Sequence, residues 1–198
     1  FIPTPEHYRG NVSSIGPRAC YDESKRLAET LAMVYHTEYG VPIKIVRPFN
    51  VYGPGMRPDD YRVVPTFIVR ALTRGVLPVH DQGNQTRTFC YVQDGITAFF
   101  KALLSGKDGG VYNVGIDTGE ITMVALANTV VRLAGTGAGV TTVPYPEAYP
   151  SDEPRRRCPD ISKIRRDVGF APAVALEDGL ARTIGWFRDT LPPGYTLG

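Results

Sequence analysis

A helical stretch that leads directly into a short strand constrains the fold of this chain more than any other feature. Residues 21–39 are predicted to form the helix, because Gly40 and Pro42 are residue types that commonly end one. Residues 43–46 predict the strand, which runs into a turn-rich loop at 47–54. In open α/β sheets, ligands bind beyond the carboxyl ends of the strands. This loop is therefore the first candidate position for a binding site.

The rest of the chain continues the alternation of helices and strands. We expect further helices at residues 63–74, 93–104, 122–134, 161–168 and 176–190, and further strands at 77–80, 86–92, 110–115 and 140–143. The proline-rich passage at 144–159 is too long for a simple connector and is a candidate binding loop.

This pattern predicts the α/β class. Residues 1–60 would form the second half of a doubly wound parallel sheet. Residues 61–198 would form a smaller mixed α/β lobe, interwoven with late elements of the sheet at about 86–115.

Composition argues against several classes of function. The 198 residues include 22 Lys and Arg against 20 Asp and Glu, and the basic residues are scattered, so no nucleic-acid partner is expected. No apolar run is long enough for a membrane span and the first residues do not resemble a signal peptide, so we expect no membrane partner and a cytoplasmic location. Cys20, Cys90 and Cys158 include no close pair, which predicts neither a disulfide framework nor a metal site. We expect Cys20 and Cys90 to be buried small side chains.

Tyr21 and Lys25 are the first candidate catalytic pair. They are four residues apart on the predicted helix, so their side chains share one face. A free phenol titrates near pH 10, about three units too high for a base at pH 7, and a neighbouring cation corrects this. The same spacing also occurs where a half-buried tyrosine lies beside a solvated lysine, so the pair alone leaves a structural role open.

Further short motifs follow one another along the chain. In order they are Gly10-Asn11, Gly16-Pro17-Arg18, Arg47-Pro48-Phe49-Asn50-Val51-Tyr52-Gly53-Pro54, Gln85-Thr86-Arg87-Thr88-Phe89, Tyr112-Asn113-Val114-Gly115 and Arg157-Cys158-Pro159-Asp160. From about Glu6 to Phe187 the series resembles the extended short-chain dehydrogenase/reductase family of nucleotide-sugar epimerases, dehydratases and decarboxylases. Within that family, residues 15–22 and 85–92 are most similar to the branch that decarboxylates UDP-glucuronate.

The resemblance implies roles for particular residues. Tyr21 would be the base for the C4 hydroxyl of the sugar, Lys25 would bind the nicotinamide ribose, and Arg157 would complete the catalytic set. The cofactor would be NAD, bound by Tyr21, Lys25, Pro48 and Val51. The UDP-sugar would be bound by Asn50, Val64, Phe67, His80, Arg87 and Arg157. Arginine suits this demand, because its planar guanidinium matches phosphate oxygens in two-point contacts.

The resemblance also implies a reaction and an assembly. The reaction is NAD-dependent decarboxylation of UDP-glucuronate to UDP-xylose through a 4-keto intermediate, carried out by a homodimer. Two alternatives stay open, a nucleotide-sugar 4-epimerase or 4,6-dehydratase, and a truncated, non-catalytic nucleotide-sugar-binding module.

The second alternative arises because the chain has no Gly-x-Gly-x-x-Gly fingerprint. The glycine cluster at 135–139 lacks this pattern and follows a helix instead of a strand. By the resemblance, residues 1–60 are the second half of an NAD-binding Rossmann domain. We expect its first half, roughly 100 residues, to precede Phe1 in a longer protein.

Overall fold

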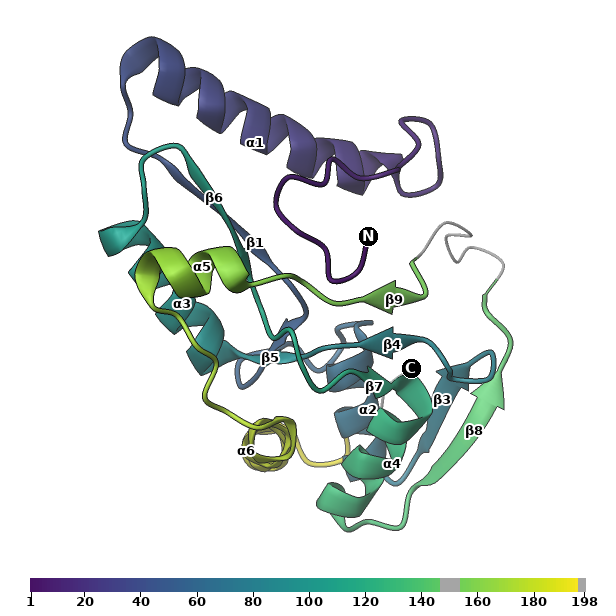
Figure 1. Cartoon of the computed structure of the whole chain (residues 1–198). Helices are drawn as coiled ribbons and strands as arrows, with labels where there is room; N and C mark the ends of the chain where they lie inside the picture. The colour runs from purple at the N-terminus through teal and green to yellow at the C-terminus, as the bar shows by residue number, and fades with distance from the viewer. Residues whose placement is uncertain (147–153, 196–198) are drawn as a thin grey trace.

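A computed structural model describes residues 1–146 and 154–195 (Figure 1). The helices are α1 (Ala19–Tyr39), α2 (Val63–Leu72), α3 (Val92–Ser105), α4 (Met123–Ala134), α5 (Ser162–Val168) and α6 (Leu176–Thr190). The strands are β1 (Lys44–Pro48), β2 (Val51–Tyr52), β3 (Val76–His80), β4 (Thr86–Arg87), β5 (Cys90–Tyr91), β6 (Gly110–Val114), β7 (Ile121–Thr122), β8 (Gly139–Val143) and β9 (Arg156–Arg157). The α/β class is confirmed.

Strands β1 and β6 pair in parallel, and the loop after β1 that was predicted to lie at a binding site follows the carboxyl end of this pair. The register runs from Lys44 opposite Gly110 to Pro48 opposite Val114, so the carboxyl ends of both strands meet. Helices α3 and α5 cover this pair and share a small core with β6. Its buried members are Ala98, Ala102, Tyr112, Val114, Ile161, Ile164 and Phe170.

A larger core joins α2, β3, α4 and α6. Strand β3 pairs with β8 in parallel, and α2 and α4 pack against that pair. Among the fully buried side chains of this core are Ile68, Leu77, Leu126 and Leu180. Because α3 and α5 belong to the smaller core, residues beyond position 60 contribute to both parts of the molecule. The domain boundaries themselves stay a prediction.

The expected single strand at 86–92 is wrong. Strand β4 joins a mixed sheet with β7 and β9, whereas β5 pairs in parallel with β2. Thr88 and Phe89, between the two strands, carry the chain from one sheet to the other. Strand β9 lies within the proline-rich passage at 144–159, of which residues 147–153 lie outside the described part.

Helix α1 lies at one side of the molecule and has no buried residue (Figure 1). It ends as predicted, because Gly40 adopts the left-handed conformation with φ 66° and its N–H donates to the carbonyl of His36. Leu27, Leu31 and Val34 on this helix are exposed. Within the described ranges, no helix has the length and apolar character that a membrane crossing requires.

The cysteine prediction is correct at one position and wrong at another. Cys90 is buried, as expected, but Cys20 is exposed, because it lies in the first turn of the unburied helix α1. Burial raises the pKa of the Cys90 thiol to about 12, with a smaller contribution from the charge of Asp94. Burial also raises the pKa of Cys158.

Alkylation should therefore separate the three thiols. A raised pKa keeps Cys90 and Cys158 protonated and unreactive at neutral pH, whereas Cys20 is open to solvent. We expect iodoacetamide to modify Cys20 in the native protein and the other two only after unfolding, as measured by peptide mass spectrometry. Equal labelling of Cys20 and Cys90 in the native protein would contradict the burial described here.

Candidate active site

The helix α1 presents Tyr21 and Lys25 together at the surface. The Tyr21 side chain is 57% exposed, and the Nζ atom of Lys25 lies 5.5 Å from the centre of its ring. The guanidinium carbon of Arg18 lies 5.6 Å from the same ring. The shared helix face is confirmed, and the geometry gives an accessible phenol with two cations beside it. A phenol placed in this way can exchange a proton with a bound hydroxyl group.

The loop after β1 is held in place by its own backbone and by one amide side chain. Asn50 has φ 45°, a conformation that Asn tolerates better than most residues, and its Nδ2 donates to the carbonyl of Thr88 at 2.8 Å. Gly53 packs closely on α3, where a Cβ would lie 2.4 Å from a methyl carbon of Val92. Pro48 is exposed. The loop therefore presents a fixed surface at the carboxyl end of β1.

Arg87 and Arg157 lie opposite each other in the parallel pair of β4 and β9. Arg87 is only 9% exposed. Its guanidinium donates to the carbonyls of Thr86, Arg155 and Pro154, at 2.8, 2.9 and 2.6 Å. Arg87 thus fixes the backbone that leads into Arg157, in addition to any contact with a ligand.

The neighbouring charges of this region form surface ion pairs. Arg155 lies 3.2 Å from Asp81, and Arg156 pairs with Glu120, whose pKa its guanidinium lowers. Asp160 accepts the backbone N–H of Ser162 at 2.8 Å, which lowers the pKa of that carboxyl group. Asp160 therefore lies just before the start of α5, where a negative charge is favourable.

Three residues expected to bind the UDP-sugar, Val64, Phe67 and His80, differ in their surroundings. Val64 and Phe67 are each 2% exposed and belong to the larger core. The ring of His80 stacks on Tyr145 with centroids 5.2 Å apart, and Gln85 donates to the Tyr145 hydroxyl at 3.0 Å. Val64 and Phe67 recur at helical spacing on α2. Such spacing shows that residues share one face of a helix, but it does not show whether that face packs in a core or against a ligand.

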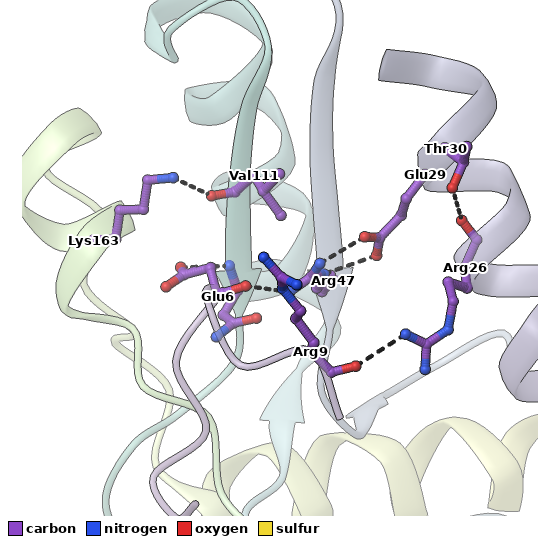
Figure 2. Close-up of polar contacts among 9 residues, drawn as sticks. Glu6, Arg9, Arg26, Glu29, Thr30, Arg47, Val111 and Lys163 are labelled. Carbon is purple, nitrogen blue, oxygen red and sulfur yellow. Dashed lines mark hydrogen bonds and ion pairs between the residues drawn. The ribbon is translucent and has the colours of Figure 1, made fainter. Parts of the chain in front are cut away.

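A polar network beside α1 involves charged residues for which the sequence predicted no role. Figure 2 shows the guanidinium of Arg47 between the carboxylate of Glu29 and the backbone of Glu6. Arg47 directly precedes Pro48, and Glu29 follows Lys25 by one helical turn. In the sequence, Arg47 and Glu29 are visible only as one charged residue in the motif at 47–54 and one on the helix that carries Tyr21 and Lys25. Nothing in the sequence indicates that the two residues form a pair.

The residues present fit the nicotinamide end of a dinucleotide. Tyr21 and Lys25 offer a phenol and an ammonium group to ribose hydroxyls. An open groove of about 300 Å³ is lined by residues 51–56. The groove is also lined by Arg57, Asp60 and Arg62, which suits a polar ligand. A fingerprint for the cofactor diphosphate is absent from the 198 residues. Within residues 1–146 and 154–195, no three His, Cys, Asp or Glu side chains lie together in a group that could hold a metal ion.

Parallel strands with a loop at their carboxyl ends, and a tyrosine beside a lysine on the neighbouring helix, are consistent with the class of dinucleotide-binding α/β proteins. The comparison with family models gives the particular family. The NAD dependent epimerase/dehydratase family matches residues 3–115, and the chain belongs to that family. This confirms the expectation drawn from the motifs.

Similar proteins are known in sequence and in structure. The chain is 48% identical over 178 residues to UDP-glucuronic acid decarboxylase 3 of Arabidopsis thaliana. The aligned region covers 90% of this chain and 50% of that protein. It superposes with a TM-score of 0.84 and 28% identity on a UDP-glucose 4-epimerase of Thermotoga maritima with UDP-glucose, covering 96% and 58% of the two chains. The chain spans about half the length of the curated relatives it matches.

A second solved structure is similar in fold and carries both a cofactor and a sugar nucleotide. It is a UDP-glucuronic acid 4-epimerase of Bacillus cereus in complex with UDP-glucuronic acid and NAD. The TM-score is 0.77 at 30% identity, covering 92% of this chain and 57% of that one.

Proposed function

We propose that the protein is an NAD-dependent decarboxylase that converts UDP-glucuronate to UDP-xylose through a 4-keto intermediate. The observation that carries this proposal is the 48% identity to a plant UDP-glucuronic acid decarboxylase along 90% of the chain. The epimerases of known structure described above are more distant, at 28% and 30% identity. The exposed pair of Tyr21 and Lys25 supports an enzyme over a binding module, because it places a proton acceptor beside a cation.

The chain's own residues would manage the proton and the orientation of the sugar. NAD held by Tyr21, Lys25, Pro48 and Val51 would supply reversible oxidation at C4. A ketone at C4 lies β to the C5 carboxylate, so carbon dioxide could leave, and the enolate left behind would take up a proton at C5 before the ketone is reduced again. The phenolate of Tyr21 accepts the proton of the C4 hydroxyl and gives it back when the ketone is reduced. The Lys25 ammonium would lie beside that phenolate and would donate a hydrogen bond to the nicotinamide ribose, and Pro48 and Val51 would help to hold the nicotinamide.

Cations of the second lobe would hold the substrate's negative charges. We assign Arg157 to the sugar and its phosphates, with Asn50 beside it at the loop after β1. Arg87 would contribute through its position opposite Arg157 and through the carbonyls it holds. His80, next to Tyr145, is the remaining candidate for the nucleotide base.

Assembly and location belong to the same proposal. We propose a homodimer that associates along α1, supported by exposed apolar side chains at Leu27, Leu31 and Val34. A cytoplasmic location is supported by the three free cysteines, since such thiols persist in reducing compartments.

Product analysis tests the proposed reaction. The natural protein is incubated with NAD and UDP-glucuronate, and released carbon dioxide and the nucleotide sugar are quantified together. We expect one carbon dioxide per UDP-xylose. A C4-inverted product that keeps its carboxylate identifies an epimerase, and a product that has lost water identifies a dehydratase. Protein without bound NAD and without turnover identifies a binding module.

A further inference from the structure

The orientation of α1 needs a physical cause, because the helix buries no residue of its own. Tyr21 and Lys25 both depend on this helix for their position. Some of its polar contacts reach only adjoining loops, such as Arg26 Nη1 to the carbonyl of Arg9 at 3.0 Å and His36 Nδ1 to that of Val41 at 2.8 Å. Neither contact leads to the loop after β1.

A two-point ion pair connects α1 to β1. Arg47 Nε donates to Glu29 Oε1 at 2.8 Å and Arg47 Nη2 donates to Glu29 Oε2 at 2.6 Å (Figure 2). The two side chains are 31% and 30% exposed, so solvent screens the pair less than an ion pair on the open surface. Two parallel hydrogen bonds also fix the relative angle of the groups they join.

The Arg47 end of the pair is itself firmly held. Arg47 Nη1 donates to the carbonyl of Glu6 at 2.9 Å, and Glu6 Oε1 accepts the backbone N–H of Asn113 at 2.9 Å. Asn113 is 1% exposed, lies opposite Arg47 in the register of β1 and β6, and donates through Nδ2 to the carbonyls of Thr4 and Asp160. The guanidinium therefore has little freedom to follow a moving helix.

The Glu29 end lies on the catalytic side of α1. Glu29 follows Lys25 by four residues and Tyr21 by eight, so the three side chains lie along one side of the helix. Arg47 is the residue immediately before Pro48. The pair consequently joins the helix that carries the proton acceptor to the strand that carries the nicotinamide loop.

We propose that Arg47 and Glu29 are a positioning pair, which sets the distance between Tyr21 and the loop at residues 48–51. The inference rests on the proposed function, in which both must face the same sugar carbon. Neither side chain touches the reacting atoms, so they act through Tyr21 and Pro48. A displacement of about 1 Å at such a distance costs on the order of 100-fold in rate.

The first test is Glu29→Gln in the natural protein. The variant keeps the size of the side chain but loses its charge and one of its two acceptor oxygens. We expect the single-turnover rate of NADH formation per bound NAD to fall at least about 10-fold. We expect the KM for UDP-glucuronate to stay within about twofold, because the substrate cations are elsewhere. Normalising to bound NAD excludes unfolded or empty molecules from the comparison.

Glu23→Gln is the matched control. Glu23 is on the same helix and its carboxylate lies 3.5 Å from Arg26, with both side chains more than 40% exposed. The substitution removes the same charge without touching β1, so rate and KM should be unchanged.

A cofactor-free measurement is hydrogen exchange of the amides at residues 21–39. Exchange should be faster in Glu29→Gln than in the wild type and in Glu23→Gln, because α1 has lost its link to β1.

Arg47→Lys provides a second variant, which keeps the charge but cannot make the two-point contact. It should slow the single-turnover rate as Glu29→Gln does, and the double variant should be little slower than either single one. An unchanged rate per bound NAD in both single variants overturns the positioning role. A wild-type protein that releases no carbon dioxide overturns the proposed reaction instead, and hydrogen exchange then still decides whether the pair fixes α1.

Discussion

Tyr21→Phe should lower kcat by about 1,000-fold, the largest effect on activity expected for any single substitution in this chain. The ring keeps its place on α1, so the contacts of Lys25 and Arg18 with its face are preserved. The C4 hydroxyl, however, loses the group that accepts its proton. The NAD content should fall only slightly, because Lys25, Pro48 and Val51 keep their proposed contacts with the cofactor. Steady-state release of carbon dioxide, together with the NAD content of the purified variant, measures both expectations.

Tyr35→Phe is the control for this experiment. Tyr35 is on the same helix, is 55% exposed, and packs on Tyr39 with ring centroids 5.4 Å apart. Removal of its hydroxyl should leave kcat at the wild-type value. If Tyr21→Phe and Tyr35→Phe had the same activity, the proton acceptor would have to be sought elsewhere.

Local signals were enough to predict the helices. The glycine at position 40 ends α1, and the predicted helix 176–190 coincides with α6. Thr122, the first residue of the predicted helix 122–134, caps α4 by accepting the backbone N–H of Ala125 at 3.2 Å. Each of these features depends on residues within one or two turns, so the sequence carries all the necessary information.

Features set by distant partners were not predictable in the same way. The chain between Thr86 and Tyr91 is divided between two sheets because its partners, Arg156 and Val51, lie 70 and 39 residues away from the residues they face. The ion pair of Glu29 and Arg47 joins residues 18 apart, through a contact that neither helix nor strand periodicity specifies. The motifs identified the catalytic helix and its loop, but not the contact that joins them.

Gly179→Ala should be the most informative substitution for stability. On α6, a Cβ at this position would lie 2.2 Å from the Tyr52 hydroxyl and 2.9 Å from Cδ2 of Tyr91. Tyr52 is 2% exposed and its hydroxyl donates to the carbonyl of Leu176 at 3.1 Å, so the ring cannot retreat without losing that bond. Overpacking costs about 2 kcal/mol and the lost hydrogen bond about 1 kcal/mol, against a gain of about 1 kcal/mol in helix propensity. We expect a net loss of about 2 kcal/mol in the free energy of unfolding, measured by denaturant titration.

Gly185→Ala on the same helix should have the opposite sign. A Cβ there would meet no heavy atom within 4 Å, so the variant should gain up to about 1 kcal/mol. Both substitutions restrict the unfolded chain equally, so this contribution cancels when the two are compared. The difference between them, about 3 kcal/mol, therefore measures the contact of α6 with Tyr52 and Tyr91. Two variants of equal stability would mean that α6 does not approach Tyr52 as closely as described, and that the larger core is packed differently where it meets β2 and β5.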